Sequence, residues 1–119
     1  MHHLWECAWT GYDPAVPQRA WLPAGLFDLV ICTDVLEHIP EDDLRGWVID
    51  ELFGKARRGV FIAVPTFVIE EKLPNGEYTH CTARPREWWL PLLQDAATRH
   101  NVKLVAMIKD DPRHDPRIT

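Results

Sequence analysis

Two short apolar runs separated by one helical pattern constrain the fold of this chain more than any other feature. Residues 27–33 (FDLVICT) and 60–64 (VFIAV) are rich in β-branched and apolar types, which is typical of parallel strands buried on both faces. The stretch between them, residues 41–56, predicts a helix with one apolar stripe, formed by Leu44, Trp47, Val48, Leu52 and Ala56. Strands separated by helices favour crossover connections, and therefore an α/β fold with a mainly parallel sheet and flanking helices.

The rest of the chain extends this order. The first helix is expected to end at Gly59, and residues 66–84 form a long irregular loop with a turn at 74–76. Residues 85–100 predict a second helix that Pro91 should kink or split, and residues 102–108 predict a last strand. Upstream, residues 5–12 suggest a strand ending at Asp13-Pro14, and the proline-rich stretch 14–25 predicts a loop, with room for one short strand around 19–22.

Composition narrows the function classes. The 119 residues carry a net charge of −5, and the scattered arginines form no basic face of the kind that nucleic-acid binders present. No run of about 18 apolar residues indicates a membrane span. The three cysteines suggest no disulfide framework, so a cytoplasmic location is expected. We expect Cys32 to be a buried small apolar residue, and we expect no metal site, because no Cys or His spacing supports one.

The segment Phe27–Pro40 (FDLVICTDVLEHIP) resembles the fourth strand and following turn of class I S-adenosylmethionine-dependent methyltransferases. Gly11-Tyr12-Asp13-Pro14 resembles the end of the family's second strand, and residues 60–64 resemble its fifth. Residues 73–89 (LPNGEYTHCTARPREWW) resemble an insert and helix of a bacterial and phage subgroup, of the type 11/12 kind. The resemblance covers residues 11–109, and residues 110–119 are expected to be a charged, frayed tail.

This resemblance implies a partial Rossmann-like, doubly wound sheet that binds S-adenosyl-L-methionine at the carboxyl ends of its strands. It implies that Asp13 accepts hydrogen bonds from the cofactor's ribose. The turn after the first buried strand would contact the cofactor through Thr33, Asp34, Leu36 and Glu37. Alternatively, Asp34 caps a helix, and Glu37 and His38 have structural roles.

Methyl transfer is an in-line displacement in which positioning supplies much of the rate. A base is needed only where the acceptor must lose a proton, and His38 and His80 are the candidates. The acceptor is expected to be a small molecule or a sugar, with an acceptor pocket lined by Tyr78, His80 and Arg84 or, alternatively, with these as surface loop residues. Trp88 and Trp89 are expected in the core rather than in a ligand platform.

One family feature is missing. A complete domain of this kind begins with a strand, a G-x-G-x-G loop and a helix, whereas only ten residues precede Gly11 here, and none is glycine. The chain is therefore expected to be a truncated domain over residues 1–109. Two hypotheses follow: a methyltransferase fragment, or an inactive binding or scaffold module that self-associates or is completed by a partner chain. A different nucleotide-binding doubly wound domain is a third, which the D-x-L-E-H-I turn disfavours.

Overall fold

The protein forms a three-stranded parallel sheet flanked by helices. The structure, a computed structural model, describes residues 10–13, 17–19, 25–67, 74–76 and 81–110. Its strands are β1 (Phe27–Thr33), β2 (Ala56–Pro65) and β3 (Lys103–Lys109), which lie side by side in the order β1-β2-β3. The predicted strands 27–33, 60–64 and 102–108 are thus confirmed, and so is the α/β class with a parallel sheet.

The first crossover is helical from residue 41 to residue 54. It consists of α1 (Glu41–Asp43), a π-helical segment (Leu44–Val48) and α2 (Ile49–Gly54). The acidic residues of its first turn face the positive end of the helix dipole. The predicted end at Gly59 is wrong, because β2 already begins at Ala56 and Gly59 pairs with Leu29 and Lys103 inside the sheet.

The second crossover ends in α3 (Arg86–His100), which confirms the helix predicted for 85–100. Pro85 precedes the first helical residue, and Asn101 ends the helix in the left-handed conformation with φ 55°. Pro91 does not split α3, and it lies exposed on the helix surface. The apolar stripe of α3 is formed by Trp89, Leu93, Ala96 and Ala97, all buried.

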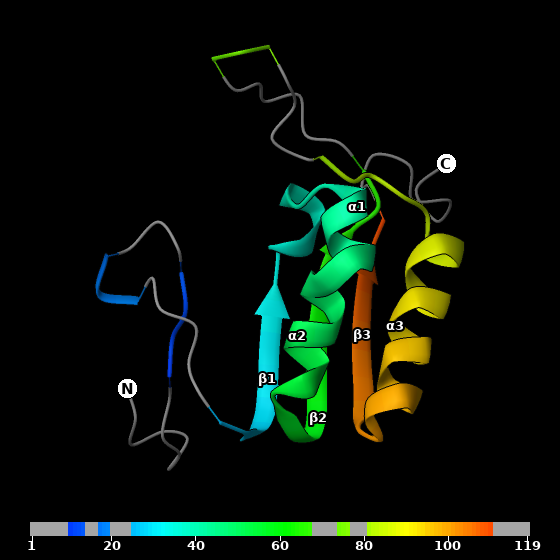
Figure 1. The fold of residues 1–119 in the computed structure, drawn as a ribbon. Helices are drawn as coiled ribbons and strands as arrows, with labels where there is room; N and C mark the ends of the chain where they lie inside the picture. The colour runs from blue at the N-terminus through cyan, green and yellow to red at the C-terminus, as the bar shows by residue number, and fades with distance from the viewer. Residues whose placement is uncertain (1–9, 14–16, 20–24, 68–73, 77–80, 111–119) are drawn as a thin grey trace.

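Both helical crossovers lie on the same face of the sheet (Figure 1). Each parallel connection is right-handed in nearly all proteins, and both connections here advance in the same direction, from β1 to β2 and from β2 to β3. The helices therefore cover only one face. The core lies between this face and the helices, and its strand residues include Cys32, Val60, Ile62, Val64 and Ile108.

Residues before β1 take no part in the described sheet. Thr10–Asp13 are irregular and exposed, and Pro17–Arg19 form one turn of 3-10 helix. The strand suggested for 5–12 is therefore absent over residues 10–12, and its remainder lies outside the described residues, as do residues 20–22 and 111–119. Within the described part of the chain, no helix is long and apolar enough to cross a membrane.

Candidate functional site

The turn that follows β1 lies at the carboxyl edge of the sheet. Asp34 adopts a left-handed backbone with φ 56°, a conformation that Asp tolerates better than most residues. Its N–H donates to the carbonyl of Ala63 over 2.9 Å, which continues the pairing of β1 with β2 by one more bond. A turn of 3-10 helix, Leu36–His38, then leads into the first crossover. The strand end and the turn are thus fixed by the backbone before any ligand is considered.

The side chains at this edge form a row of alternating charges. The Asp34 carboxylate pairs with the ammonium of Lys109, the last residue of β3. The next residue, Asp110, accepts a 3.0 Å hydrogen bond from the Thr66 hydroxyl and lies 3.9 Å from Arg86 Nη2. Arg86 also donates to the Ile108 carbonyl over 3.0 Å. The row therefore ties together the ends of all three strands and the beginning of α3.

Among the described residues at this edge, Glu37 is the one acidic side chain that is buried. Only 2% of it is exposed, and its Oε1 has no hydrogen-bond partner among the described residues. The other oxygen, Oε2, lies 3.7 Å from Nε2 of the half-exposed His38. A buried polar atom without a partner carries most of its desolvation cost, so this oxygen is an unused acceptor in the structure.

The loop before α3 is attached to the same turn through Thr82. Its N–H donates to the Glu37 carbonyl over 3.0 Å, and its hydroxyl donates to the Ile39 carbonyl over 2.7 Å. Both bonds are made by a residue with only 2% exposure. Thr82 therefore ties the loop before α3 to the backbone on both sides of His38, next to the Glu37 side chain.

Cys32 lies on the helix-covered face of β1, where its thiol interacts electrostatically with the Glu37 carboxylate. Burial raises the pKa of its thiol to about 12, and the negative charge of Glu37 adds to the rise. The thiol therefore stays protonated at neutral pH. The burial of Cys32 confirms the prediction of a buried small apolar residue. Leu36 is likewise fully buried in the core, whereas Thr33 is exposed at the strand end.

The turn residues do not act as helix caps. The 3-10 turn begins after Val35 without a side-chain cap, so the alternative role of Asp34 as a cap is not seen.

Trp89 lies in the core with no exposed surface, as predicted for it, but its Nε1–H has no partner among the described residues. Trp88 packs beside it edge to face, at 4.9 Å between ring centroids.

Of the remaining predicted site residues, those that the structure describes are not assembled with this turn. Asp13 lies in the exposed irregular stretch before β1, and no described strand delivers it to the sheet edge. Tyr78 and His80 fall outside the described residues. Arg84 donates two hydrogen bonds to Glu41 Oε2, at 3.1 and 2.8 Å, and its guanidinium lies 5.7 Å from the Trp88 ring.

Two residues of the edge were missed by sequence reasoning. The predicted last strand ends at residue 108, before Lys109, and Thr82 falls in the predicted loop 66–84, for which the sequence predicts no contacts. The position of Lys109 directly after the apolar run 104–108 is a usable signal, because residues that end parallel strands meet at one edge. Nothing in the sequence around Thr82 marks its two bonds.

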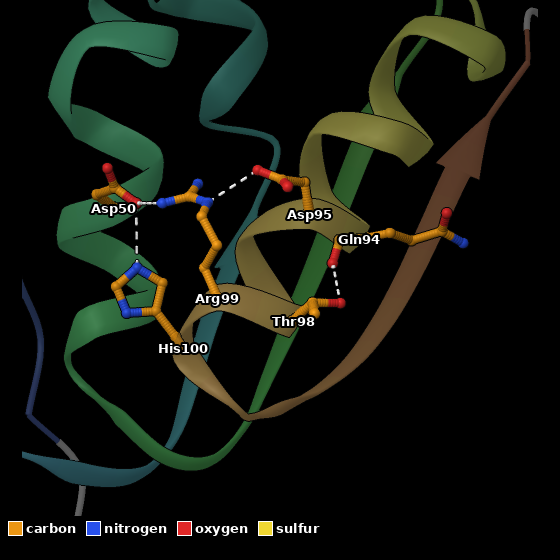
Figure 2. A network of polar contacts seen from close by, with 6 residues as sticks. All are labelled: Asp50, Gln94, Asp95, Thr98, Arg99 and His100. Atoms are coloured by element: carbon orange, nitrogen blue, oxygen red, sulfur yellow. Dashed lines mark hydrogen bonds and ion pairs between the residues drawn. The ribbon is translucent and has the colours of Figure 1, made fainter.

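A second polar cluster joins α2 to the end of α3 (Figure 2). Asp50 of α2 accepts bonds from His100 Nε2, at 3.0 Å, and from Arg99, both at the end of α3. Arg99 also donates to Asp95 over 2.8 Å. The bonds from His100 and then Arg99 lower the pKa of Asp50. This cluster joins the two helices on their exposed side, so we assign it a structural role.

The described residues contain no group of three or more His, Cys, Asp or Glu side chains arranged to hold a metal ion. No known family model matches the chain, and no curated protein or solved structure matches it. The structure therefore shows an α/β protein. The carboxyl edge of its sheet carries a row of charged side chains and one buried carboxylate.

Proposed function

We propose that this chain is part of a class I S-adenosylmethionine-dependent methyltransferase domain with a Rossmann-like sheet, and that its turn from Thr33 to Glu37 forms one wall of the cofactor site. The observation that carries the proposal is the buried Glu37 oxygen without a partner, at the carboxyl edge of a parallel sheet. Ligands of such sheets gather at this edge. The resemblance of Phe27–Pro40 to the family supplies the identity of the ligand.

The residues present fit part of such a cofactor. S-adenosylmethionine carries hydrogen-bond donors and a positively charged sulfonium, from which the methyl group is transferred. Glu37 Oε1 is a buried acceptor without a partner among the described residues, and Asp34 is a carboxylate whose charge favours a nearby cation. Thr33 and Asp34 present exposed atoms, whereas the buried Leu36 supports the turn from below.

His38 is the candidate base of the described residues. Its imidazole is 44% exposed, and its Nε2 lies 3.7 Å from Oε2 of the Glu37 carboxylate. Such a residue removes a proton from an acceptor hydroxyl or amine, as a small molecule or sugar would offer. His80 remains the second candidate on sequence grounds.

Isothermal titration of the full chain with S-adenosylhomocysteine tests the proposal. We expect binding with a Kd below 1 mM, weakened at least about tenfold by Glu37→Gln, because a charge-assisted bond contributes about 1.5–3 kcal/mol. Asp50→Asn is the matched control, since this carboxylate belongs to the polar cluster between α2 and α3 and not to the turn from Thr33 to Glu37. Absence of heat at millimolar ligand would contradict cofactor binding by this chain.

A second function, a binding module completed by another chain, is favoured by one observation. Among the described residues β1 is an edge strand that pairs only with β2, on one side. Exposed edges of this kind accept further strands. We expect a completing chain to add its strands next to β1, and restored cofactor affinity in a mixture of both chains would distinguish this from binding by the chain alone.

A further inference from the structure

The helical part of the first crossover contains an unusual feature, the π-helical segment at Leu44–Val48. Such segments are rare, and they occur frequently at functional sites. Leu44 and Val48 are buried in the core, whereas Arg45 is exposed. The next residue, Gly46, is also exposed, and a side chain at its position would meet no atom of the described residues within 4 Å. The surface beside Arg45 is therefore accessible to a ligand.

Two guanidinium groups lie over one indole ring next to this segment. The Cζ atom of Arg45 lies 5.0 Å from the centroid of the Trp88 ring, and that of Arg84 lies 5.7 Å from the same ring. Trp88 is half-buried in α3 and packs edge to face against the fully buried Trp89, so the core holds its ring in place. Cation–π attraction therefore orders both guanidinium groups before any ligand binds.

The charges of the two arginines are balanced differently. Arg84 donates two hydrogen bonds to Glu41 Oε2, so this carboxylate neutralises its charge. Glu41 precedes Arg45 by one helical turn, but both of these bonds go to Arg84. Arg45 forms no hydrogen bond or ion pair with any described residue, including the exposed Asp42 and Asp43 beside it. Its N–H groups are therefore donors without an acceptor in the described part of the chain.

We propose that Arg45, ordered by the Trp88 ring, binds the carboxylate or phosphate group of a small-molecule ligand. A guanidinium presents its N–H groups as a rigid fork that matches the oxygens of either group in a bidentate manner. Nucleic acids are bound by several cations together. A chain with a net charge of −5 and one unpaired arginine on this ring suits a single oxyanion instead.

The Arg45 site is linked to the turn that follows β1. Thr82, two residues before Arg84, donates its hydroxyl hydrogen to the Ile39 carbonyl over 2.7 Å, and Glu41 lies two residues after Ile39. The ion pair of Arg84 with Glu41 therefore continues the connection between the loop before α3 and this turn. The inference does not rest on cofactor binding at the turn, because the contacts of Arg45 and Arg84 with Trp88 are formed without a cofactor.

Nuclear magnetic resonance of the full chain tests the proposal. The Nε–H signals of Arg45 and Arg58 and the Nε1–H signal of Trp88 are followed at pH 6.5 while sodium phosphate or sodium acetate is added at constant ionic strength. Arg58 of β2 is the matched control in the same molecule. It is also exposed, and it forms no hydrogen bond, ion pair or ring contact with a described residue.

We expect the Arg45 and Trp88 signals to saturate with one shared Kd below about 20 mM, a value within reach of a bidentate charged pair. The Arg58 signal should shift at least about fivefold less. The anion with the lower Kd identifies the acidic group of the ligand. Signals of Arg45 and Arg58 that shift alike, without saturation, would overturn the proposal.

Arg45→Lys separates the guanidinium from its charge. Lysine keeps the positive charge but has no planar fork, so the affinity read from the Trp88 signal should fall at least about fivefold. The dispersion of the remaining signals shows whether the variant is folded, and folding is expected because Arg45 is exposed. An unchanged affinity in this variant would also overturn the proposal, because the anion would then respond to charge alone.

Discussion

Lys109, the last residue of β3, forms an ion pair with Asp34, the residue that follows β1, although β2 lies between the two strands. The pair therefore crosses the carboxyl edge of the sheet. It places a cation beside the carboxylate that the proposed function would use to favour a sulfonium. A bound cation would compete with Lys109 for Asp34. The ion pair with this lysine therefore weakens the attraction of the Asp34 carboxylate for a cationic ligand.

Lys109→Met tests this competition. Removing the ammonium leaves Asp34 without its ion pair, so we expect preference for the positively charged S-adenosylmethionine over the neutral S-adenosylhomocysteine to rise at least about threefold. That factor corresponds to about 0.6 kcal/mol, within the range of exposed charge pairs. The unfolding free energy should fall by less than about 1 kcal/mol. Lys103→Met, at the other end of β3, is the control, and an equal rise in both variants would refute the role of Lys109.

Glu37→Met tests the buried carboxylate independently of any ligand. Methionine has a similar volume and no polar oxygen, so it removes the desolvation cost of an oxygen without a partner. We expect the free chain to gain about 1 kcal/mol or more in urea unfolding while losing cofactor binding. Glu51→Met, at a half-exposed position of α2, should change stability by less than about 0.5 kcal/mol. A destabilised Glu37→Met would show that the carboxylate already has a compensating contact.

The sequence predicts both ends of β1 correctly, because an apolar run between turn signals fits few structures other than a buried strand. The prediction of where the helix of the first crossover ends is wrong. Ala56 continues the helical stripe in the pattern, but it is buried equally well as the first residue of β2. A small apolar residue fits both the helical and the strand periodicity. The pairing of Ala56 with Phe27 is what assigns Ala56 to β2.

The candidate site likewise contains features that the local sequence predicts and features that depend on contacts between distant residues. The segment from Thr33 to His38 is local, and its place at the carboxyl edge follows from the strand before it. The ion pair of Asp34 with Lys109 spans 75 residues of sequence, and the bonds of Thr82 to the turn depend on how the long loop returns. Neither is encoded in a local pattern. The bare sheet face is equally a product of the shared direction of the two crossovers.

Cys32 should remain unreactive in the folded protein, whereas Cys81 is exposed and should react. Iodoacetamide at pH 8 followed by mass spectrometry is expected to modify Cys81 and leave Cys32 intact. Because the folded-state pKa of Cys32 is raised from 9.0 to about 12, the associated stability is complete below pH 9 and is lost as the pH rises toward 12. The free energy of unfolding should fall by about 2–3 kcal/mol between pH 9 and pH 11.

Cys32→Ala separates this loss from other alkaline effects. The variant cannot ionise at this position, so the gap between its unfolding free energy and that of the unsubstituted chain should narrow between pH 9 and pH 11. Urea unfolding at both pH values measures the gap. A gap that stays constant would mean that the thiol titrates alike in the folded and unfolded chains.

The bonds of Asp50 to His100 and Arg99 predict a contribution to acid stability. Since these bonds lower the pKa of Asp50 in the folded chain, their stabilisation is present above the unfolded value of about 3.9 and is lost as the pH falls through the lower folded value. Asp50→Asn should therefore lower the Tm at pH 6, and the difference from the unsubstituted chain should shrink below pH 4. Asp43→Asn, at an exposed position of α1, provides the comparison. A Tm difference that is the same at pH 6 and pH 3 would show that the bonds to the carboxylate do not link the two helices through its charge.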